Sequence, residues 1–320
     1  MTDLLLDIKD LEVEYSVRTG RVKAVDRVNL SIYEGETLGL VGESACGKST
    51  LGRALLRLVS SPGEIVGGQI VFKEENLLAI SEPEMSRIRG KNISMVFQDP
   101  MTSLNPLMRI EDHFVETIRT HETNVSKREA RERTARMFDH LGVQGNRLAD
   151  YPHQLSGGMR QRVMIGLALI LNSDLVIADE PTTSLDVIVE AQILDLLKHL
   201  KQTYDMTLIL ITHNLGIVAE LADRIAVMYA GQVVEVAPVQ MLFGDPLHPY
   251  TQGLLASVPN IQLEDAELRT MPGSPPDLIH PPSGCRFRPR CSHMTDRCRT
   301  DQPPYRAVRR ERWTACWLYE

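Results

Sequence analysis

The sequence feature that most constrains this chain is Gly42–Thr50, which reads GESACGKST and fits the pattern G-x-x-x-x-G-K-[S/T]. The residues before it, Thr37–Val41, predict a buried parallel strand, and Ser49–Leu58 predict a helix. A glycine-rich turn can match the pattern by chance. Because strand, loop and helix follow one another in register, the sequence favours a phosphate-binding loop in an α/β fold.

The residue types of this loop explain how it would hold a triphosphate. Glycine has no Cβ, so backbone N–H groups can approach the phosphates, and the helix N-terminus adds partial positive charge. We expect Lys48 to contact the β- and γ-phosphates and the Ser49 hydroxyl to bind Mg²⁺. The loop residues expected around the nucleotide are Gly42, Ser44, Cys46, Gly47, Lys48, Ser49 and Thr50.

Two carboxylates end the apolar run Leu175–Glu180. At the end of a parallel strand, Asp179 would hold Mg²⁺ through the water shell of the metal. Glu180 would orient and deprotonate the hydrolytic water. Paired acids at a strand end can also be simple solvated termini. The phosphate loop upstream favours the catalytic interpretation.

Gln98 and His213 each follow another predicted strand, Ile93–Phe97 and Thr207–Thr212. We expect Gln98 to contact Mg²⁺ or the attacking water, and His213 to donate a hydrogen bond to the γ-phosphate. The alternatives are a plain loop glutamine and a structural histidine, which are the usual roles of isolated residues of these types. The other predicted phosphate contacts favour the functional roles.

A second turn with anion-binding chemistry is Leu155–Met159, which reads LSGGM and precedes a predicted helix over 160–171. Ser156, Gly157 and Gly158 would present backbone donors at the positive end of that helix. The sequence therefore predicts two phosphate-binding helix ends in one chain.

The remaining pattern outlines the fold. Alternating apolar residues over 6–32 predict an antiparallel strand pair laid beside the phosphate-loop strand. Tyr15 in this pair is either a partner for an adenine base or a half-buried strand aromatic. Residues 110–148 predict helices, with Ser126 as an N-cap and Gly142 near a stop.

Length and composition limit the alternatives. With 320 residues, the chain is expected to contain a large domain over 1–245, with a helical subdomain over about 100–170, and an extension over 246–320. A hairpin over 225–235 would end the large domain. The longest apolar run is far shorter than the roughly 20 residues needed to cross a bilayer, and the start lacks the basic region of a signal peptide. The net charge of −7 argues against a general nucleic-acid binder.

In order and spacing, these motifs resemble the complete set of an ABC transporter nucleotide-binding subunit. The motifs that carry the resemblance are Gly42–Thr50, Gln98, Leu155–Met159, Leu175–Glu180, Ser184–Asp186 and His213. The resemblance implies an α/β ABC-type P-loop ATPase core with a mixed, partly parallel sheet, an antiparallel β subdomain and a helical subdomain. It also implies that two subunits, arranged head to tail, sandwich and hydrolyse ATP.

The same resemblance assigns further roles. Ser156 and Gly157 of a partner would close over the ATP held by the loop, and Asp186 would lie at the dimer seam. Tyr15 would stack on adenine. Gln98 would sense the nucleotide near the groove that receives a permease helix.

Two residues depart from the commonest family pattern. Cys46 stands where such loops often have glycine, and Asn214 follows His213 where relatives often have aspartate. Neither change removes a catalytic group. A thiol near Lys48 and a helix N-terminus is expected to have a lowered pKa and to be prone to oxidation. The alternative is a small residue that is simply tolerated there.

Beyond the core, His248–Thr251 predict a short helix to about Val258, and the prolines over 272–282 predict an extended tether. With the cysteines that follow, this extension resembles the oligopeptide and dipeptide importer branch of the ABC family, which also includes nickel importers. The resemblance implies a second ATPase subunit, usually a paralogue but possibly an identical chain, two transmembrane permeases and, indirectly, an extracytoplasmic solute-binding protein. It implies a peripheral position at the cytoplasmic face of the inner membrane.

Four cysteines lie in the C-terminal tail in the arrangement C-x5-C-x6-C-x17-C, namely Cys285, Cys291, Cys298 and Cys316. A reducing cytosol disfavours disulfides and so favours a metal site. Structural zinc usually uses tighter cysteine pairs, whereas wide spacing also suits a [4Fe–4S] cluster. Because some peptide importer subunits similar to this chain carry such a cluster, we expect iron–sulfur, with zinc as the alternative. The cluster would stabilise a small tail that lacks a core of its own.

Two other functions compete with an importer ATPase. A soluble ABC ATPase of translation or DNA repair usually has two tandem ATPase halves or a long coiled-coil insertion, and neither is visible. A nucleic-acid-binding module would use the tail, where nine arginines stand against four acidic residues over 285–320. No recognised nucleic-acid pattern surrounds the aromatic residues of the tail, so we expect no nucleic-acid partner.

Overall fold

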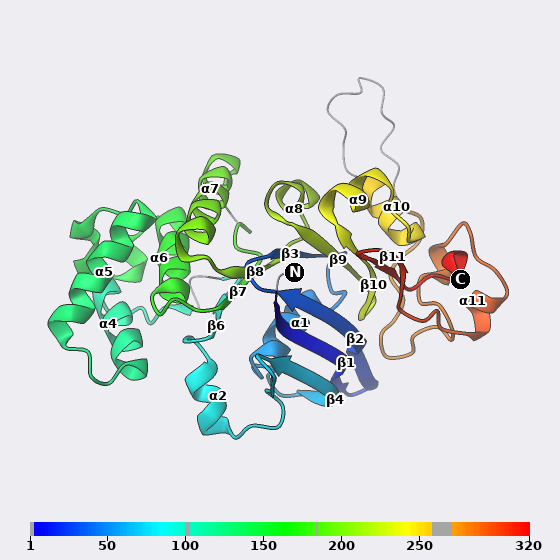
Figure 1. Cartoon of the computed structure of the whole chain (residues 1–320), viewed down its shortest axis with the longest axis horizontal. Helices are drawn as coiled ribbons and strands as arrows, with labels where there is room; N and C mark the ends of the chain where they lie inside the picture. Colours follow the sequence, from blue (N-terminus) through cyan, green and yellow to red (C-terminus); the bar gives the residue numbers. More distant parts are fainter. Residues whose placement is uncertain (1–2, 100–102, 184, 258–270) are drawn as a thin grey trace. The chain divides into compact units, whose positions relative to one another are not determined.

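The computed structural model describes residues 3–99, 103–183, 185–257 and 271–320 (Figure 1). The chain forms two compact units. The first unit joins residues 1–79 to 211–320, and the second unit spans 80–210. Ser184, which begins one of the predicted motifs, and the predicted helix end at Val258 lie outside the described residues.

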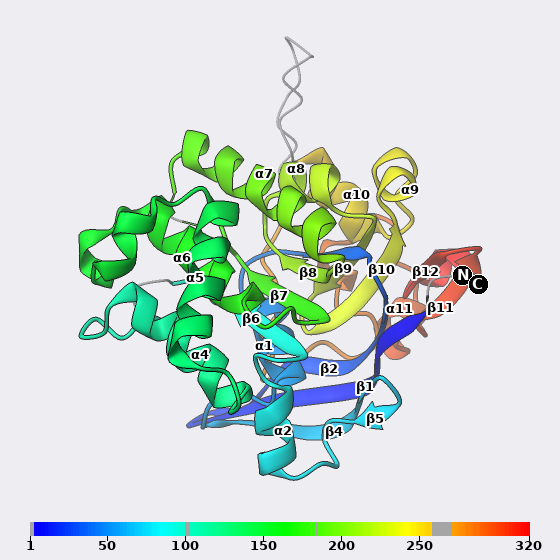
Figure 2. The same cartoon turned by 60° about the vertical axis from the view of Figure 1, so that its left-hand side comes forward.

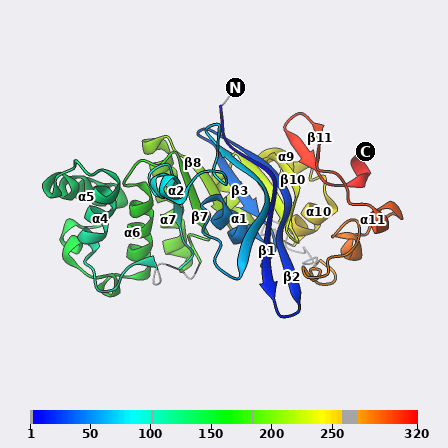
Figure 3. The same cartoon turned by 90° about the horizontal axis from the view of Figure 1, so that it is seen from below.

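One sheet of the first unit is antiparallel and starts from the long β1–β2 hairpin (Figure 3). Its strands, in the order β2-β1-β4-β5, are β1 (Leu4–Val17), β2 (Gly20–Tyr33), β4 (Gly63–Phe72) and β5 (Glu75–Asn76). The predicted pairing over 6–32 is confirmed, with Leu6 opposite Ile32. The prediction that this strand pair lies beside the phosphate-loop strand is wrong. β4 pairs with the other edge of β1, and these strands form a sheet that does not contain the phosphate-loop strand.

The phosphate-loop strand lies in a mixed sheet. The strands of this sheet in the first unit, in the order β11-β12-β10-β9-β3, are β3 (Thr37–Val41), β9 (Arg224–Tyr229), β10 (Gln232–Pro238), β11 (Arg306–Arg309) and β12 (Arg312–Thr314). β3 and β9 are parallel, and β9 and β10 form the predicted hairpin. β12 pairs with β10, so the C-terminal tail extends this sheet. The short, arginine-rich strands β11 and β12 carry no apolar alternation, so the sequence did not predict them.

The helices of the first unit surround this sheet and build the extension. They are α1 (Lys48–Leu55), α8 (Leu215–Leu221), α9 (Val239–Gly244), α10 (Pro249–Ala256) and α11 (Arg297–Thr300), with 3-10 turns at Arg288–Arg290 and Trp317–Tyr319. α10 begins within the predicted segment, and residues 271–287 form neither helix nor strand, as their prolines predict. Gly39 lets α8 approach β3, because a Cβ there would lie 2.3 Å from Cγ1 of Val218.

One hydrophobic core joins the phosphate-loop sheet to the C-terminal extension. It contains Val41 of β3, Tyr229 of β9, Leu242 of α9, Tyr250 of α10 and Phe287 of the tail. The tail therefore contributes a buried aromatic ring, Phe287, to the core of the first unit. That residues 246–320 form a separate domain stays a prediction.

The second unit combines parallel strands with a group of helices (Figure 2). Its strands, in the order β8-β7-β6, are β6 (Ile93–Val96), β7 (Leu175–Asp179) and β8 (Thr207–Ile211). Its helices are α2 (Glu82–Ile88), α4 (Ile110–His121), α5 (Lys127–Leu141), α6 (Gly157–Leu169) and α7 (Val187–Tyr204), with 3-10 turns at Gly145–Ala149 and Pro152–Gln154. β6 and β7 pair in parallel, as their apolar sequences predict.

The helices α4, α5 and α6 pack against one another in the second unit (Figure 2). Phe114 and Phe138 meet edge to face, with ring centroids 5.6 Å apart. The predicted helix signals are confirmed. Ser126 caps α5 by accepting a hydrogen bond from the amide of Glu129, and Gly142 ends it with φ of 63°. Among the described residues, no helix combines the length and the apolar character that crossing a bilayer requires.

Candidate functional site

The phosphate loop connects the end of β3 to the start of α1. Its glycines are required by their surroundings, since φ is 156° at Gly42 and 107° at Gly47. A Cβ on Gly42 would lie 2.1 Å from the carbonyl oxygen of Met228, and one on Gly47 would lie 2.1 Å from that of Ala24. Packing against β9 and β2 therefore demands glycine here, in addition to the predicted approach of phosphates.

Lys48 is buried at the first position of α1. Its ammonium donates hydrogen bonds to the carbonyl oxygens of Gly42 (2.8 Å) and Glu43 (3.0 Å), so the positive charge lies inside the loop. The hydroxyl-bearing residues of the loop are half-buried or exposed, namely Ser44, Ser49 and Thr50. The local fold thus places the predicted cation at the centre of the predicted phosphate cradle.

Cys46 is a buried residue of the loop, with 5% of its surface exposed. Burial raises the pKa of its thiol, and the charge of Lys48, with Nζ 3.8 Å from Sγ, opposes this only in part. The expectation of a lowered pKa is therefore wrong, because desolvation of the thiolate outweighs the neighbouring cation. The structure favours the alternative of a small, tolerated residue.

Glu43 is a loop residue that the sequence analysis did not single out. Its amide donates a hydrogen bond to the Tyr250 hydroxyl (2.9 Å), and its carboxylate pairs with Arg290. These partners lie 207 and 247 positions further along the chain. No periodicity or motif links positions so distant, so only the fold reveals the contact.

The second unit brings two predicted catalytic residues together. The Gln98 amide donates a hydrogen bond to the Glu180 carboxylate (3.0 Å), and the Thr183 hydroxyl donates to the same oxygen (2.9 Å). Glu180 follows β7 with φ of 47°, a left-handed conformation that is uncommon outside glycine. Asp179, the last residue of β7, is buried. Thr183 was missed because a threonine after paired acids has no signal of its own.

The Ser156 turn opens α6. The Ser156 side chain is the N-cap and accepts a hydrogen bond from the amide of Met159 (3.3 Å), so α6 starts at Gly157 and not at 160 as predicted. Gly158 packs against α7, since a Cβ on it would lie 2.6 Å from Cγ1 of Val189. Asp186 is the N-cap of α7. The Ser156 turn thus opens a helix, as the sequence predicts, and Asp186 opens another.

His213 and Tyr15 both belong to the first unit. His213 is exposed and lies two residues after the end of β8. The next residue, Asn214, caps α8. Tyr15 is half-buried on β1, with one edge of its ring against Gly63 of β4. Neither placement decides whether these side chains contact a nucleotide, so both roles stay predictions.

The four tail cysteines line one pocket of about 140 Å³, together with His248 and Pro249 of the extension. Burial raises the pKa of Cys285 and of Cys316 to about 11. Among the described residues, no three or more histidine, cysteine, aspartate or glutamate side chains are close enough together to hold one metal ion. The fold nevertheless gathers four thiols, the first and last of which are 31 positions apart in the sequence, around one pocket.

Comparison with known proteins places these features in a family. The ABC transporter family matches residues 25–183, and the oligopeptide/dipeptide transporter C-terminal region matches residues 234–298. Among solved structures, the dimeric ATP-binding cassette MJ0796 bound to ADP and Pi has a TM-score of 0.67 and 27% identity, covering 73% of this chain and 99% of that one. The predicted α/β ABC ATPase fold is thus confirmed.

Curated relatives match along nearly the whole chain. The dipeptide transport ATP-binding protein DppD of Bacillus subtilis is 45% identical over 99% of this chain and 95% of its own length. The oligopeptide transport ATP-binding protein OppD of Escherichia coli is 45% identical over 98% of this chain and 93% of its own length. Since both the ATPase core and the extension find counterparts in single relatives, the chain belongs to the ABC transporter family, among its oligopeptide/dipeptide transporter ATP-binding proteins.

Proposed function

We propose that this ABC ATPase powers the uptake of dipeptides or oligopeptides through a membrane permease. The observation that carries the proposal is the match of its C-terminal region, residues 234–298, to the oligopeptide/dipeptide transporter family. Relatives named as dipeptide and oligopeptide transport proteins support it. The chain would act at the cytoplasmic face of the inner membrane with two permeases and a second ATPase subunit. An extracytoplasmic solute-binding protein would deliver the peptide.

The phosphate loop would bind ATP. Lys48 would neutralise the β- and γ-phosphates, because its ammonium already lies among the loop carbonyls. Ser49, Asp179 and Gln98 would hold Mg²⁺, since hydroxyl, carboxylate and amide oxygens are the ligands this hard cation prefers. Bound Mg²⁺ would offset phosphate charge. Tyr15 would stack on the adenine base through the exposed part of its half-buried ring.

Hydrolysis would depend on Glu180 as general base. One oxygen of its carboxylate accepts hydrogen bonds from Gln98 and Thr183, and these two donors would orient the carboxylate to take a proton from water. His213 would donate a hydrogen bond to the γ-phosphate. The carboxylate is oriented before reaction, so little reorganisation would be needed when the water attacks.

A second subunit would complete the ATP site. Ser156, Gly157 and Gly158 of one subunit would close over ATP bound to the other, since the turn is accessible and opens a helix of 13 residues. Asp186 would lie at the seam between subunits. The similar cassette MJ0796 has been solved as a dimer, which supports this arrangement. The partner would be a paralogue or an identical chain.

The four tail cysteines would hold a [4Fe–4S] cluster. A single zinc ion needs four sulfurs about 2.3 Å from one point, whereas each thiolate of a four-iron cluster binds a different iron. The four cysteines line one pocket, and their wide spacing along the chain favours the cluster over zinc. The group would cross-link the tail and supply no redox step to ATP hydrolysis.

Metal analysis and spectroscopy of the whole chain test the cluster. Anaerobically purified protein should contain about four irons per chain, with broad visible absorption and an EPR signal after reduction. Substituting Cys298→Ser should reduce the iron content, whereas Cys46→Ser should not, because Cys46 lies in the phosphate loop. One zinc per chain without iron would overturn the iron–sulfur assignment.

Reconstitution tests the transport function. The chain should be co-purified with its permeases and second ATPase, placed in lipid vesicles and supplied with the binding protein. We expect ATP-dependent uptake of a labelled peptide that unlabelled peptides suppress and Ni²⁺ does not. Uptake of nickel, with no effect of peptides, would contradict the proposal and favour the nickel importers of the same branch. Purification without any membrane partner and tight, salt-sensitive RNA binding would favour a nucleic-acid function.

A further inference from the structure

Glu43 of the phosphate loop is held twice by the C-terminal extension. Its carboxylate accepts hydrogen bonds from Nη1 and Nη2 of Arg290, at 2.9 and 3.0 Å. Its amide donates to the hydroxyl of Tyr250 at 2.9 Å. Since Glu43 directly follows Gly42, both contacts act on the part of the loop where the chain leaves β3. The side chain and the backbone of one loop residue are thus fixed from outside the loop.

Contacts other than Glu43 also hold the Arg290 side chain in place. Its side chain is 4% exposed, and its Nε donates to the carbonyl oxygen of Pro272 (2.9 Å). Its guanidinium lies 5.8 Å from the centroid of the Tyr229 ring. A planar guanidinium fits a carboxylate with two parallel hydrogen bonds, which fixes direction as well as distance. The pair is therefore more constraining than an exposed salt bridge.

Tyr250 is also immobilised. Its ring is fully buried, with centroids 4.4 Å from Tyr229 and 5.5 Å from Phe287. Its own amide donates to Nδ1 of His248 (3.0 Å), which caps α10. The hydroxyl therefore meets the Glu43 amide from a rigid aromatic cluster. Within the first unit, His248 thus caps α10, and Tyr250 binds the phosphate loop at Glu43.

The supports of the loop are continuous with the cysteine pocket. Arg290 directly precedes Cys291, and Cys285 and Cys291 pack against the core that contains Tyr229 and Tyr250. An ordered tail is therefore what brings the guanidinium of Arg290 to the loop.

We propose that Arg290 and Tyr250 are positioning residues for the phosphate loop, which hold Glu43 so that the loop is preorganised for ATP. The inference rests on the proposed role of Gly42–Thr50 as the ATP cradle. Neither residue needs to touch the nucleotide. Loss of either would let the start of the loop relax, and ATP binding would then bear the cost of ordering it.

Equilibrium binding of Mg²⁺-ATP to the full chain, measured by calorimetry, tests the proposal. Arg290→Ala should weaken ATP binding about ten-fold, since a charge-assisted pair that orders the loop is lost. Tyr250→Phe should weaken it about three-fold, because it removes one neutral hydrogen bond. In the assembled transporter, the KM for ATP should rise while kcat at saturating ATP stays within about two-fold.

A double-mutant cycle with milder substitutions tests the same contact even if Arg290→Ala folds poorly. Glu43→Gln removes the charge from the half-buried carboxylate of the pair and should weaken ATP binding by itself. Combined with Arg290→Lys, it should cost no more than the larger single effect, because both changes act on one contact. Additive effects, or an unchanged affinity in Glu43→Gln and Arg290→Lys, would overturn the proposal.

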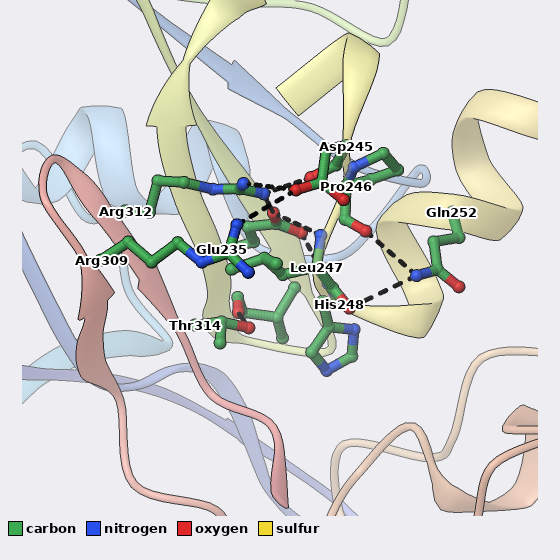
Figure 4. A network of polar contacts seen from close by, with 10 residues as sticks. Glu235, Asp245, Pro246, Leu247, His248, Gln252, Arg309, Arg312 and Thr314 are labelled. Atoms are coloured by element: carbon green, nitrogen blue, oxygen red, sulfur yellow. Dashed lines mark hydrogen bonds and ion pairs between the residues drawn. The ribbon is translucent and has the colours of Figure 1, made fainter. Parts of the chain in front are cut away.

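Arg312 provides a matched control (Figure 4). It is an equally buried arginine of the tail, but it pairs with Asp245 (2.8 Å) and Glu235 (3.7 Å) instead of the loop. Arg312→Ala should lower the melting temperature without changing ATP affinity. If it weakens ATP binding as much as Arg290→Ala does, the effect is general loss of tail stability and the positioning role is refuted. Lys48→Ala tests the ATP-binding role of the loop separately from the positioning role of Arg290 and Tyr250. Unchanged ATP binding in that variant would refute the ATP-binding role itself.

Discussion

Two helix starts of this chain, the phosphate loop before α1 and the Ser156 turn before α6, carry similar chemistry but are built differently. Three sets of contacts hold the loop. The Lys48 ammonium bonds to its carbonyl oxygens, strands β2 and β9 pack against its glycines, and the extension bonds to Glu43. Ser156 is exposed, and its hydroxyl caps its own helix. A site held within one subunit can bind alone, whereas an accessible helix start suits contact with a second molecule.

The clearest separation of ATP binding from ATP turnover is expected for Glu180, the proposed general base. If the phosphate loop binds ATP by itself, Glu180→Gln should leave ATP affinity within about two-fold while lowering kcat at least 100-fold, the range known for general bases. Binding is measured by calorimetry and turnover by phosphate release. An unchanged steady-state rate would exclude Glu180 as the base. Lost ATP binding would mean that the phosphate loop does not bind ATP independently of Glu180.

The packing of the loop predicts a large effect of one methyl group. Gly47→Ala places a Cβ against the carbonyl of Ala24 at a φ of 107° and should lower the free energy of unfolding by about 1–3 kcal/mol and impair ATP binding. Thermal unfolding measures the loss. Gly244→Ala is the control, because no atom lies within 4 Å of the added Cβ. Equal stability of the two variants would mean that the loop is not confined as described.

The Ser156 turn predicts a loss of turnover without a loss of binding. Ser156→Ala removes an N-cap and should lower the free energy of unfolding by about 1 kcal/mol, as should Ser126→Ala at the start of α5. Only Ser156→Ala should slow ATP hydrolysis in the assembled transporter, by about ten-fold if one transition-state contact is lost. Equal activities of the two variants would argue that the turn does not close over ATP.

The smallest effect is expected at Cys46. Since burial raises the pKa of its thiol, alkylation by iodoacetamide should be slow at neutral pH and should become faster only at alkaline pH, as the thiolate forms. Site-resolved mass spectrometry measures the rate. Peroxide should weaken ATP binding no more in the wild type than in Cys46→Gly. A loss confined to the wild type would revive a redox role.

Local patterns were sufficient for many of the helices and strands, although not for β11 and β12, and for most of the proposed site residues. A phosphate loop, a serine turn and polar strand ends are short motifs whose chemistry is written in adjacent residues, so Lys48, Ser156, Glu180 and Gln98 were identified without a structure. The Ser126 and Gly142 helix signals are local in the same sense. The pKa of Cys46 was predicted wrongly because sequence shows the nearby lysine but not the burial that outweighs it.

By itself, therefore, the sequence determined the order of the motifs and the positions of the four tail cysteines, since both can be read along the chain. The resemblance of those motifs to a known family indicated the α/β ABC ATPase fold. Only the tertiary structure decided that β12 extends the phosphate-loop sheet and that Arg290 and Tyr250 hold Glu43. The contacts to Glu43 join residues more than 200 positions apart, and they form because burying the aromatic core brings the tail against the loop.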